Sequence, residues 1–120
     1  MKPIINDTRF GSITIDGKEF SHDVVIRLNG KIEKRKKKLS KIEYGTSHII
    51  SVEEAKHIFD EGAQQLIIGT GQTGYVRLSS KAADFFGNKN CTFRLLSTPN
   101  ALSVWNTATG ATIGLFHVTC

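Results

Sequence analysis

Apolar and polar residues alternate in short runs over the first third of the chain, a pattern typical of half-buried β-strands. The strand-like runs are residues 10–15, 18–20, 23–28 and 31–33. Asp16-Gly17 and Asn29-Gly30 separate the runs of each pair. Such dipeptides predict tight hairpins, because a type I′ turn needs a positive φ at both positions. We therefore expect two hairpins and an antiparallel β layer at the N-terminal end.

Three later stretches carry apolar residues at helical spacing. The first begins with Ser51 and Glu54 in a capping box and ends at Gly62. The second follows Ser79 or Ser80 and stops at Gly87. The third has Thr98 as N-cap and Pro99 at its first helical position, with Gly110 after its end. The apolar faces comprise Val52, Ala55, Ile58 and Phe59, then Ala82, Ala83, Phe85 and Phe86, then Ala101, Leu102, Trp105 and Ala108.

Strands are expected between and after these helices, at residues 66–68, 75–78, 91–96 and 111–120. The run L-I-I at 66–68 does not alternate, which favours a strand covered on both faces. Strands that alternate with helices predict a partly parallel sheet. With 120 residues the chain fits a single domain spanning 1–120. We expect an α/β fold with three layers: a central mixed five-stranded sheet with helices on both sides, and an additional N-terminal antiparallel β layer made by the early hairpins.

A glycine-rich loop follows the apolar run, with Gly69, Gly71 and Gly74 at G-x-G-x-x-G spacing. A dinucleotide site needs a helix to open at such a loop, because the helix N-terminus holds the pyrophosphate. Here the β-prone residues 75–78 follow instead. The loop is therefore predicted to connect two β segments, and no nicotinamide cofactor is expected.

The glycine loop and the start of the third helix should meet where parallel strands end, the edge at which α/β sheets bind ligands. Candidate residues for a small anionic ligand are Gly69, Thr70, Gly71, Gly74, Thr98, Asn100 and Ala101. Backbone N–H groups of the loop and of residues 98–101 would bind the anion. The alternative is a loop that only turns tightly beside an ordinary helix cap.

Charge is concentrated in one strip. The chain has a formal net charge of +5, and residues 31–41 alone carry a net +6, with seven Lys or Arg and one Glu. The core of the strip is Lys34, Arg35, Lys36, Lys37 and Lys38. It suits phosphate contacts to nucleic acid, or simply a solvated edge that discourages strand pairing. Aromatic residues for base stacking are missing inside it, so the solvated surface is our expectation.

Few residues suggest catalysis. His48 lies in a polar loop beside Thr46 and Ser47 and is the candidate general base, although a loop histidine held by hydrogen bonds is the more common case. His117 and Cys120 stand three apart in an expected strand and so would face opposite ways. We therefore expect no metal site. No nucleophile elbow or phosphate-binding lysine loop is present either, and no cofactor is expected.

Six stretches together resemble the Mth-nine-three-eight domain family. They are R-F-G-S-I-T-I-D-G-K-E-F at 9–20, D-V-V-I at 23–26, Y-G-T-S-H at 44–48, I-I-G-T-G at 67–71, T-P-N-A at 98–101 and H-V-T-C at 117–120. The Y-G-T-S-H form is most similar to prokaryotic members. The resemblance implies a three-layer α/β domain with a central mixed sheet. Members often have an acidic residue where this chain has Asn100, and the eukaryotic ones act in assembly or regulation.

We therefore expect a binding or assembly module, with an unknown protein as its partner and no established catalytic activity. The alternative is an enzyme or small-ligand binder that uses the pocket at the sheet edge for an anionic ligand. A second alternative is attachment to nucleic acid through residues 31–41. The two cysteines have no paired spacing, and the N-terminus has no signal-type apolar stretch, which favours a cytoplasmic protein. No run approaches the roughly 18 apolar residues of a membrane span. The sequence leaves the oligomeric state open, because Trp105 and Phe116 would suit either a core or an interface.

Overall fold

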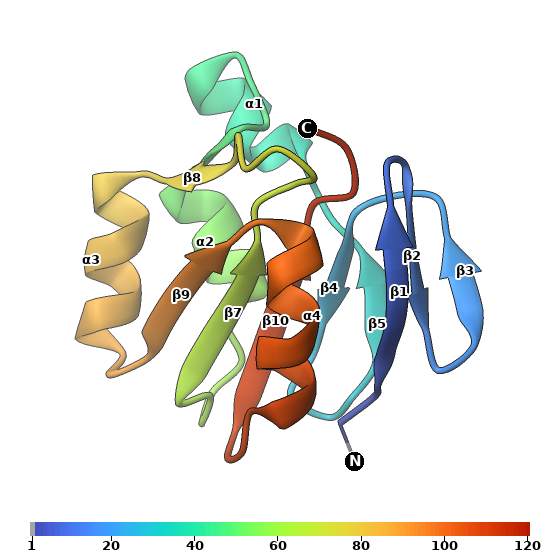
Figure 1. Ribbon diagram of the computed structural model, residues 1–120. Helices are drawn as coiled ribbons and strands as arrows, with labels where there is room; N and C mark the ends of the chain where they lie inside the picture. The colour runs from blue at the N-terminus through green and yellow to red at the C-terminus, as the bar shows by residue number, and fades with distance from the viewer. Residues whose placement is uncertain (1) are drawn as a thin grey trace.

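The computed structural model describes residues 2–120, which form three layers around a five-stranded mixed sheet (Figure 1). The strands are β1 Ile5–Arg9, β2 Ser12–Ile15, β3 Lys18–Phe20, β4 Val24–Ile26, β5 Ile32–Lys34, β6 Ile49–Ile50, β7 Gln65–Gly69, β8 Arg77–Leu78, β9 Thr92–Leu96 and β10 Thr112–Phe116. The helices are α1 Lys38–Tyr44, α2 Val52–Ile58, α3 Ser80–Asn88 and α4 Thr98–Thr107. The expected fold class is confirmed, including the separate N-terminal antiparallel sheet of β1, β2 and β3.

The first predicted hairpin is present, and its turn has the predicted geometry. Asp16 and Gly17 both have positive φ, at 49° and 80°. The prediction was wrong at its start, because Phe10 and Gly11 form a turn rather than a strand. An unexpected strand, β1, precedes that turn and pairs with β2. Only its first residue, Ile5, is buried, so the segment lacks the alternation that would have marked it.

The second predicted hairpin joins the central sheet, not the N-terminal layer. The strand order is β5-β4-β10-β7-β9, and β4 pairs with β10 antiparallel. All three residues of β4 are buried. Val25 faces one hydrophobic cluster, whereas Val24 and Ile26 face the other. A strand covered on both faces belongs inside a sheet, which is why this hairpin lies beside β10.

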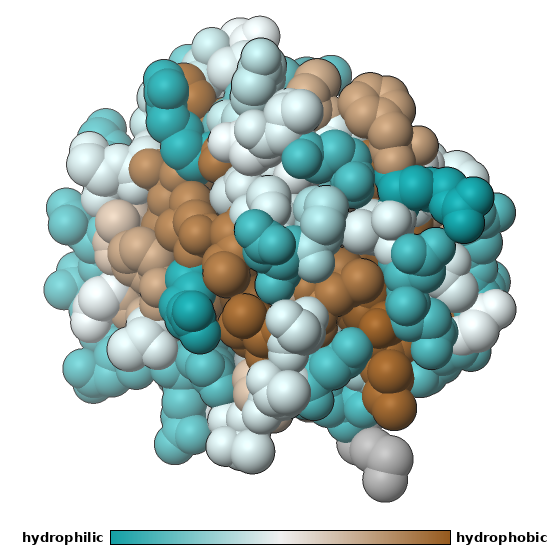
Figure 2. Space-filling model, viewed as in Figure 1, coloured by the Kyte–Doolittle hydropathy of each residue, from teal (hydrophilic) through white to brown (hydrophobic). Residues whose placement is uncertain are grey.

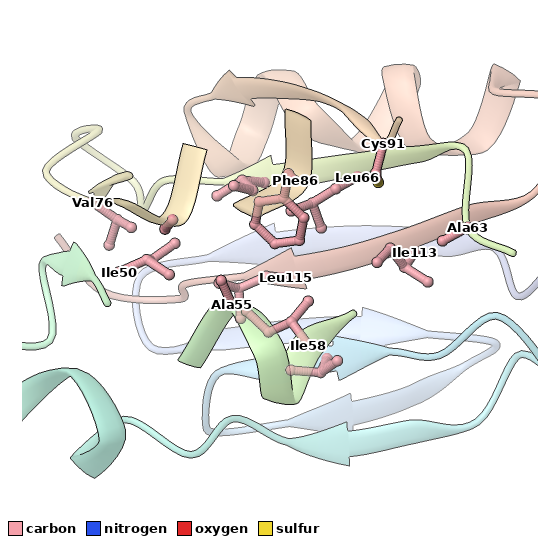
Figure 3. Packing of buried hydrophobic residues seen from close by; sticks show 13 residues of the cluster. Ile50, Ala55, Ile58, Ala63, Leu66, Val76, Phe86, Cys91, Ile113 and Leu115 are labelled. Atoms are coloured by element: carbon pink, nitrogen blue, oxygen red, sulfur yellow. The ribbon is translucent and has the colours of Figure 1, made fainter. Parts of the chain in front are cut away.

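The unbroken apolar run in β7 is explained by burial on both faces, as predicted. Leu66 and Ile68 pack into one cluster, whereas Ile67 packs into the other. Figure 3 shows the first cluster, in which Leu66, Ile113 and Leu115 from the sheet meet the side chains of α2 and α3. The second cluster fills the space between the sheet, α4 and the N-terminal strands.

The crossovers place a helix on each face of the sheet. The chain passes from β7 to the edge strand β9 through α3, then returns past β7 to β10 through α4. The two connections run in opposite directions across the sheet. Right-handed crossovers therefore require the helices to lie on opposite faces, as they do in Figure 1.

Trp105 fixes α4 against the sheet. Its side chain is fully buried, its indole N–H donates to the carbonyl of Pro3 at 2.9 Å, and its ring meets Phe116 edge-on at 5.7 Å. Gly114 makes this approach feasible, because a Cβ there would lie 2.9 Å from the Trp105 ring. Trp105 and Phe116 therefore belong to the core.

Several predicted boundaries are corrected. Helix α2 ends at Ile58 and not at Gly62, and α3 continues through Gly87 to Asn88. Helix α4 has Ser97 and not Thr98 at its N-cap, and β10 ends at Phe116. Helix α1 and strand β6 occupy a region that was expected to be loop. Helix ends shift by a turn because packing, rather than the nearest glycine, sets them.

The sheet edges differ in character. At one edge lies β5, whose end carries the start of the lysine strip. At the other lies β9, where Leu95 is 38% exposed. Figure 2 shows apolar residues in a band across the face that carries α4 and β9, interrupted by polar side chains. Charged side chains at β5 discourage another strand from pairing with that edge. Strand β9 carries fewer charged side chains. Within residues 2–120, no helix is both long and apolar enough to cross a membrane.

The glycine loop is closed by the C-terminal residues. Gly71 has a φ of +111°, and a Cβ there would lie 2.5 Å from the carbonyl oxygen of Cys120. The N–H groups of Gln72 and Tyr75 donate to the carbonyls of Thr119 and Cys120, at 2.7 and 3.0 Å. The last residues of the chain are therefore a structural part of this edge.

We expect Gly71→Ala to destabilise the protein by about 2 kcal/mol or more, because it strains φ and displaces the Cys120 backbone. Gly87→Ala is the matched control. It lies inside α3 with no atom within 4 Å of the new methyl group, so it should stabilise by about 0.5–1 kcal/mol. Urea unfolding measures both. Equal effects at the two glycines would contradict the packing described for the loop.

Candidate functional site

Four ionisable side chains from four separate segments meet in the interior. Arg35 donates to both carboxylate oxygens of Glu54, at 2.6 and 3.0 Å, and to Asp23 at 3.0 Å. Asp23 in turn accepts from the Nδ1 side of the His117 ring at 2.7 Å. Each of the four residues is at most 3% exposed. We call Asp23, Arg35, Glu54 and His117 the buried network.

Surrounding polar groups complete the hydrogen bonding of the buried network. The hydroxyl of Ser40 donates to Glu54, and Arg35 donates to the carbonyl of Ser47 at 2.7 Å. The N–H of Val118 donates to the second oxygen of Asp23 at 2.9 Å. Throughout residues 2–120, every buried side-chain nitrogen and oxygen has a hydrogen-bond partner. The desolvation of these charges is therefore offset by a full set of hydrogen bonds.

The surroundings of Asp23 set its ionisation. Burial alone would raise the pKa of this carboxyl. The hydrogen bond and charge of His117, the Val118 N–H and the Arg35 guanidinium outweigh burial and lower the pKa to about 2. For Arg35, burial acts to lower the pKa, but Glu54 and Asp23 hold it above its ordinary value. Both groups therefore stay charged at neutral pH.

His48 lies close to this site. Its ring stands edge-on to His117 with ring centroids 5.5 Å apart, and edge-on to Tyr75 at 6.0 Å. Burial, followed by the electrostatic effects of His117, Arg35 and Lys37, lowers the pKa of His48. The candidate base from the sequence therefore reaches the site. The histidine that has a carboxylate partner is, however, His117.

A basic pocket opens directly over the buried network. Its volume is about 670 Å³, and its lining comprises Ser21, His22, Asp23, Lys34, Arg35, Lys36, Lys37, Lys38, Lys41, Val118 and Thr119. Six of these residues are cationic, and one is a carboxylate. Lys37 lies 3.7 Å from that carboxylate, with its side chain 39% exposed. We call this cavity the lysine pocket.

The interpretation of residues 34–38 as one exposed strip was wrong at Arg35. That side chain is inside the protein, because it is the counterion of two buried carboxylates, whereas the lysines around it face the pocket. Whether the lysines contact nucleic acid stays a prediction. The same connection that buries Arg35 carries the chain from β5 into α1, so the pocket wall depends on the buried network.

Three of the residues predicted at the sheet edge, Thr70, Gly71 and Thr98, already use their polar groups in hydrogen bonds within the protein. The N–H of Thr70 donates to the Leu96 carbonyl, and that of Gly71 donates to the Thr98 hydroxyl at 2.9 Å. That hydroxyl donates to the His117 carbonyl at 2.6 Å. Through these hydrogen bonds Thr98 joins the glycine loop to the segment that follows β10. Gly69 ends β7 and Ala101 is buried, whereas Gly74 and Asn100 are exposed. That these residues bind an anion stays a prediction.

The sequence reasoning missed Asp23, Glu54, His117 and Thr119. Glu54 was assigned to reach back in the capping box, and that assignment was wrong. Ser51 does accept from the Glu54 N–H at 3.1 Å, but the Glu54 carboxylate turns inward. A signal was present, because Glu54 and the core residue Ile58 are four apart and share a helix face.

The prediction that His117 and Cys120 cannot share a metal ion assumed a strand through Cys120, whereas β10 ends at Phe116. Among the described residues, no three His, Cys, Asp or Glu side chains are placed to hold a metal.

We expect Arg35→Met to destabilise the protein by about 3–5 kcal/mol, because two buried carboxylates lose their counterion. Lys36→Met removes an exposed neighbouring charge and should change the stability by no more than about 0.5 kcal/mol. Urea unfolding at pH 7 compares the two variants. Similar losses for both would show that the buried network does not stabilise the fold.

The lowered pKa of Asp23 predicts a pH dependence. Stability from this carboxylate is fully present above its ordinary pKa of 3.8 and is lost as the pH falls through about 2. The wild-type protein should lose about 2 kcal/mol from this group between about pH 4 and pH 2. Asp23→Asn should be less stable at neutral pH but lose less over that window. Asp84→Asn, at an exposed carboxylate, should keep the wild-type slope. Parallel curves for wild type and Asp23→Asn would contradict the assignment.

The chain matches a protein-family model and is similar to several solved structures. A family model described as a protein of unknown function (DUF498/DUF598) matches residues 5–112. A conserved hypothetical protein from Pyrococcus horikoshii OT3 is 36% identical, covers all of both chains and superposes with a TM-score of 0.88. The protein MT938 is 30% identical over 99% of this chain and 100% of its own, with a TM-score of 0.83.

The fold extends to distant proteins. A Mth938-like domain from Bordetella pertussis is 12% identical, with 97% of this chain and 85% of its own covered and a TM-score of 0.69. The resemblance to the Mth-nine-three-eight domain family expected from the six sequence stretches is thereby confirmed. The chain belongs to the DUF498/DUF598 family, a family of unknown function, and has the Mth938-like fold.

Proposed function

We propose that this protein is a binding module whose ligand is a small molecule with at least two anionic groups, seated in the lysine pocket. The supporting observation is the charge of the lining, which includes five lysines and a single carboxylate besides the buried Arg35. That carboxylate, Asp23, is already bonded to Arg35, His117 and the Val118 N–H. The remaining lysines have no comparable number of partners and favour an incoming anion.

The shape of the pocket supports a small ligand. Its volume of about 670 Å³ falls within the usual range for small-molecule sites. The cations come from the end of β5, the connection that follows and helix α1, so they surround one cavity. Positive charges held this close repel one another, and a bound anion relieves that repulsion.

A second pocket offers a contrast. It has a volume of about 490 Å³, with Arg27, Lys31 and three carboxylates in its lining. Arg27 is paired with Glu33 at 3.1 Å and Asp60 at 3.6 Å. Its lining has two cations and three carboxylates, so it lacks the unbalanced positive charge that favours anion binding. The lysine pocket is therefore the better candidate.

The proposal keeps the binding role and the cytoplasmic location expected from the sequence and changes the site. The N–H groups of Thr70 and Gly71 are engaged within the protein, which favours the lysines as the anion contacts. An extended polyanion such as DNA would contact the same lysines. A compact pocket without base-stacking aromatics on its lining supports a small ligand instead.

Pyrophosphate and citrate are suitable probes, with acetate and glucose as comparison compounds. We expect the first two to raise the melting temperature by several degrees, since binding adds about 2.7 kcal/mol at a hundredfold excess over Kd. Acetate and glucose should have little effect. Calorimetry should show binding that weakens as salt is added.

The double variant Lys34→Gln/Lys38→Gln should weaken pyrophosphate binding tenfold or more, a loss of about 1.4 kcal/mol or more. Lys56→Gln/Lys81→Gln is the control, since it removes the same charge from exposed lysines outside the pocket. Equal losses in both double variants would overturn the pocket as the site. Tight binding of duplex DNA without any response to pyrophosphate or citrate would overturn the small-ligand class.

A further inference from the structure

Asp23, His117 and Thr119 form a chain of hydrogen-bond contacts that begins in the buried network and ends at a residue of the lysine pocket. Asp23 Oδ2 is 2.7 Å from His117 Nδ1, and His117 Nε2 is 3.2 Å from the hydroxyl oxygen of Thr119. Carboxylate, imidazole and hydroxyl thus follow one another within hydrogen-bond distance. In this order a histidine can take the proton of a hydroxyl nucleophile while a carboxylate orients its ring.

The carboxylate determines which ring nitrogen is basic. The pKa of Asp23 is lowered to about 2, so at neutral pH its oxygens only accept hydrogen bonds. Nδ1 of a neutral His117 ring must therefore carry the proton and donate it to Asp23. The lone pair is then on Nε2, which accepts from the hydroxyl of Thr119. This is the tautomer that a general base requires.

Access to this relay is through Thr119. His117 is 1% exposed and is not part of the pocket lining. Thr119 is half-buried and lines the lysine pocket. A molecule in the pocket therefore lies against Thr119, whose hydroxyl oxygen is 3.2 Å from His117 Nε2.

The rest of the buried network keeps the negative charge of Asp23 available to His117. Arg35 also contacts Asp23, at 3.0 Å, and its positive charge is shared with a second carboxylate. Glu54 accepts two hydrogen bonds from the guanidinium, at 2.6 and 3.0 Å. When His117 takes a proton, the imidazolium forms beside a carboxylate that remains ionised.

We propose that Thr119 is a nucleophile that accepts an acyl group from esters carrying an anionic group. The Thr119 oxygen bonds to the ester carbonyl carbon as its proton passes to His117 Nε2. The bond from that carbon to the leaving oxygen then breaks, and the proton passes from His117 to the departing alcohol. Water, deprotonated by His117, later attacks the acyl-threonine, which yields the carboxylic acid and restores the hydroxyl.

The substrate class rests on the proposed function, because the lysines would hold the anionic group of the ester. Lys37 lines the same pocket and lies 3.7 Å from Asp23, and it is our candidate for the cation that supports negative charge on the ester oxygen. Asp23 is assigned as a positioning residue, since it would act on the reaction through its contact with the His117 ring.

The test uses two esters, the 4-nitrophenyl ester of 4-carboxybenzoate, which is anionic, and 4-nitrophenyl benzoate, which is neutral. We expect a 4-carboxybenzoyl group on Thr119 when the reaction is quenched early, located by peptide mass spectrometry, with an initial burst of one nitrophenolate per chain before slower turnover. The anionic ester should react at least tenfold faster than the neutral one. Thr119→Val should lower the rate at least a hundredfold, whereas Thr119→Ser should keep it.

Three controls make the result specific. Thr73→Val removes another hydroxyl near the C-terminus, one that donates to the Cys120 carbonyl, and should leave the rate unchanged. The experiment is repeated with Cys120→Ser, because a neighbouring thiol also reacts with esters. Thr119→Ala replaces Thr119→Val if circular dichroism shows that the valine variant does not fold.

Acylation confined to lysines or to Cys120, or equal rates for wild type and Thr119→Val, would overturn the nucleophile. Pyrophosphate binding separates this failure from a failure of the proposed function. Binding without acylation of Thr119 leaves the anion pocket standing and overturns only the nucleophile. Equal reaction of both esters at Thr119, without pyrophosphate binding, would keep the nucleophile and overturn the anionic substrate class.

Discussion

Removal of Asp23, Arg35 and Glu54 from water is the constraint on which the rest of this structure depends. A buried carboxylate without a partner is strongly unfavourable, so Arg35 has to lie where it reaches two of them at once. These residues come from the segment before β4, the segment after β5 and helix α2. The requirement thus joins parts of the chain that the hydrophobic clusters alone would leave free to shift.

The same constraint shapes the surface above it. Because Arg35 turns inward, the chain between β5 and α1 is held against the sheet, and the adjacent lysines surround a single cavity. Asp23 also extends the buried network to His117 and the Val118 N–H, and so holds the C-terminal segment in place. The charge that favours an anion and the carboxylate that orients the imidazole therefore have one structural origin.

The glycine loop illustrates how one pattern serves two different folds. In a dinucleotide-binding fold, the helix after such a loop turns its free N–H groups toward a phosphate. Here β8 follows, and the carbonyls of Thr119 and Cys120 occupy the positions next to the loop N–H groups. The glycines are needed because the C-terminal backbone comes too close for a side chain at Gly71.

The sequence alone predicted those elements whose residues interact with near neighbours along the chain. The Asp16-Gly17 turn, the Ser51 cap and the double-sided burial of β7 follow from φ preferences, hydrogen bonds a few residues apart and the period of a strand. Strand β1 and the partnership of Arg35 with Asp23 and Glu54 left no such local mark. An arginine in a lysine-rich strip and a glutamate in a capping box are ordinary on a surface. Only the tertiary fold, which brings positions 12 and 19 residues away to Arg35, makes burial of those charges favourable.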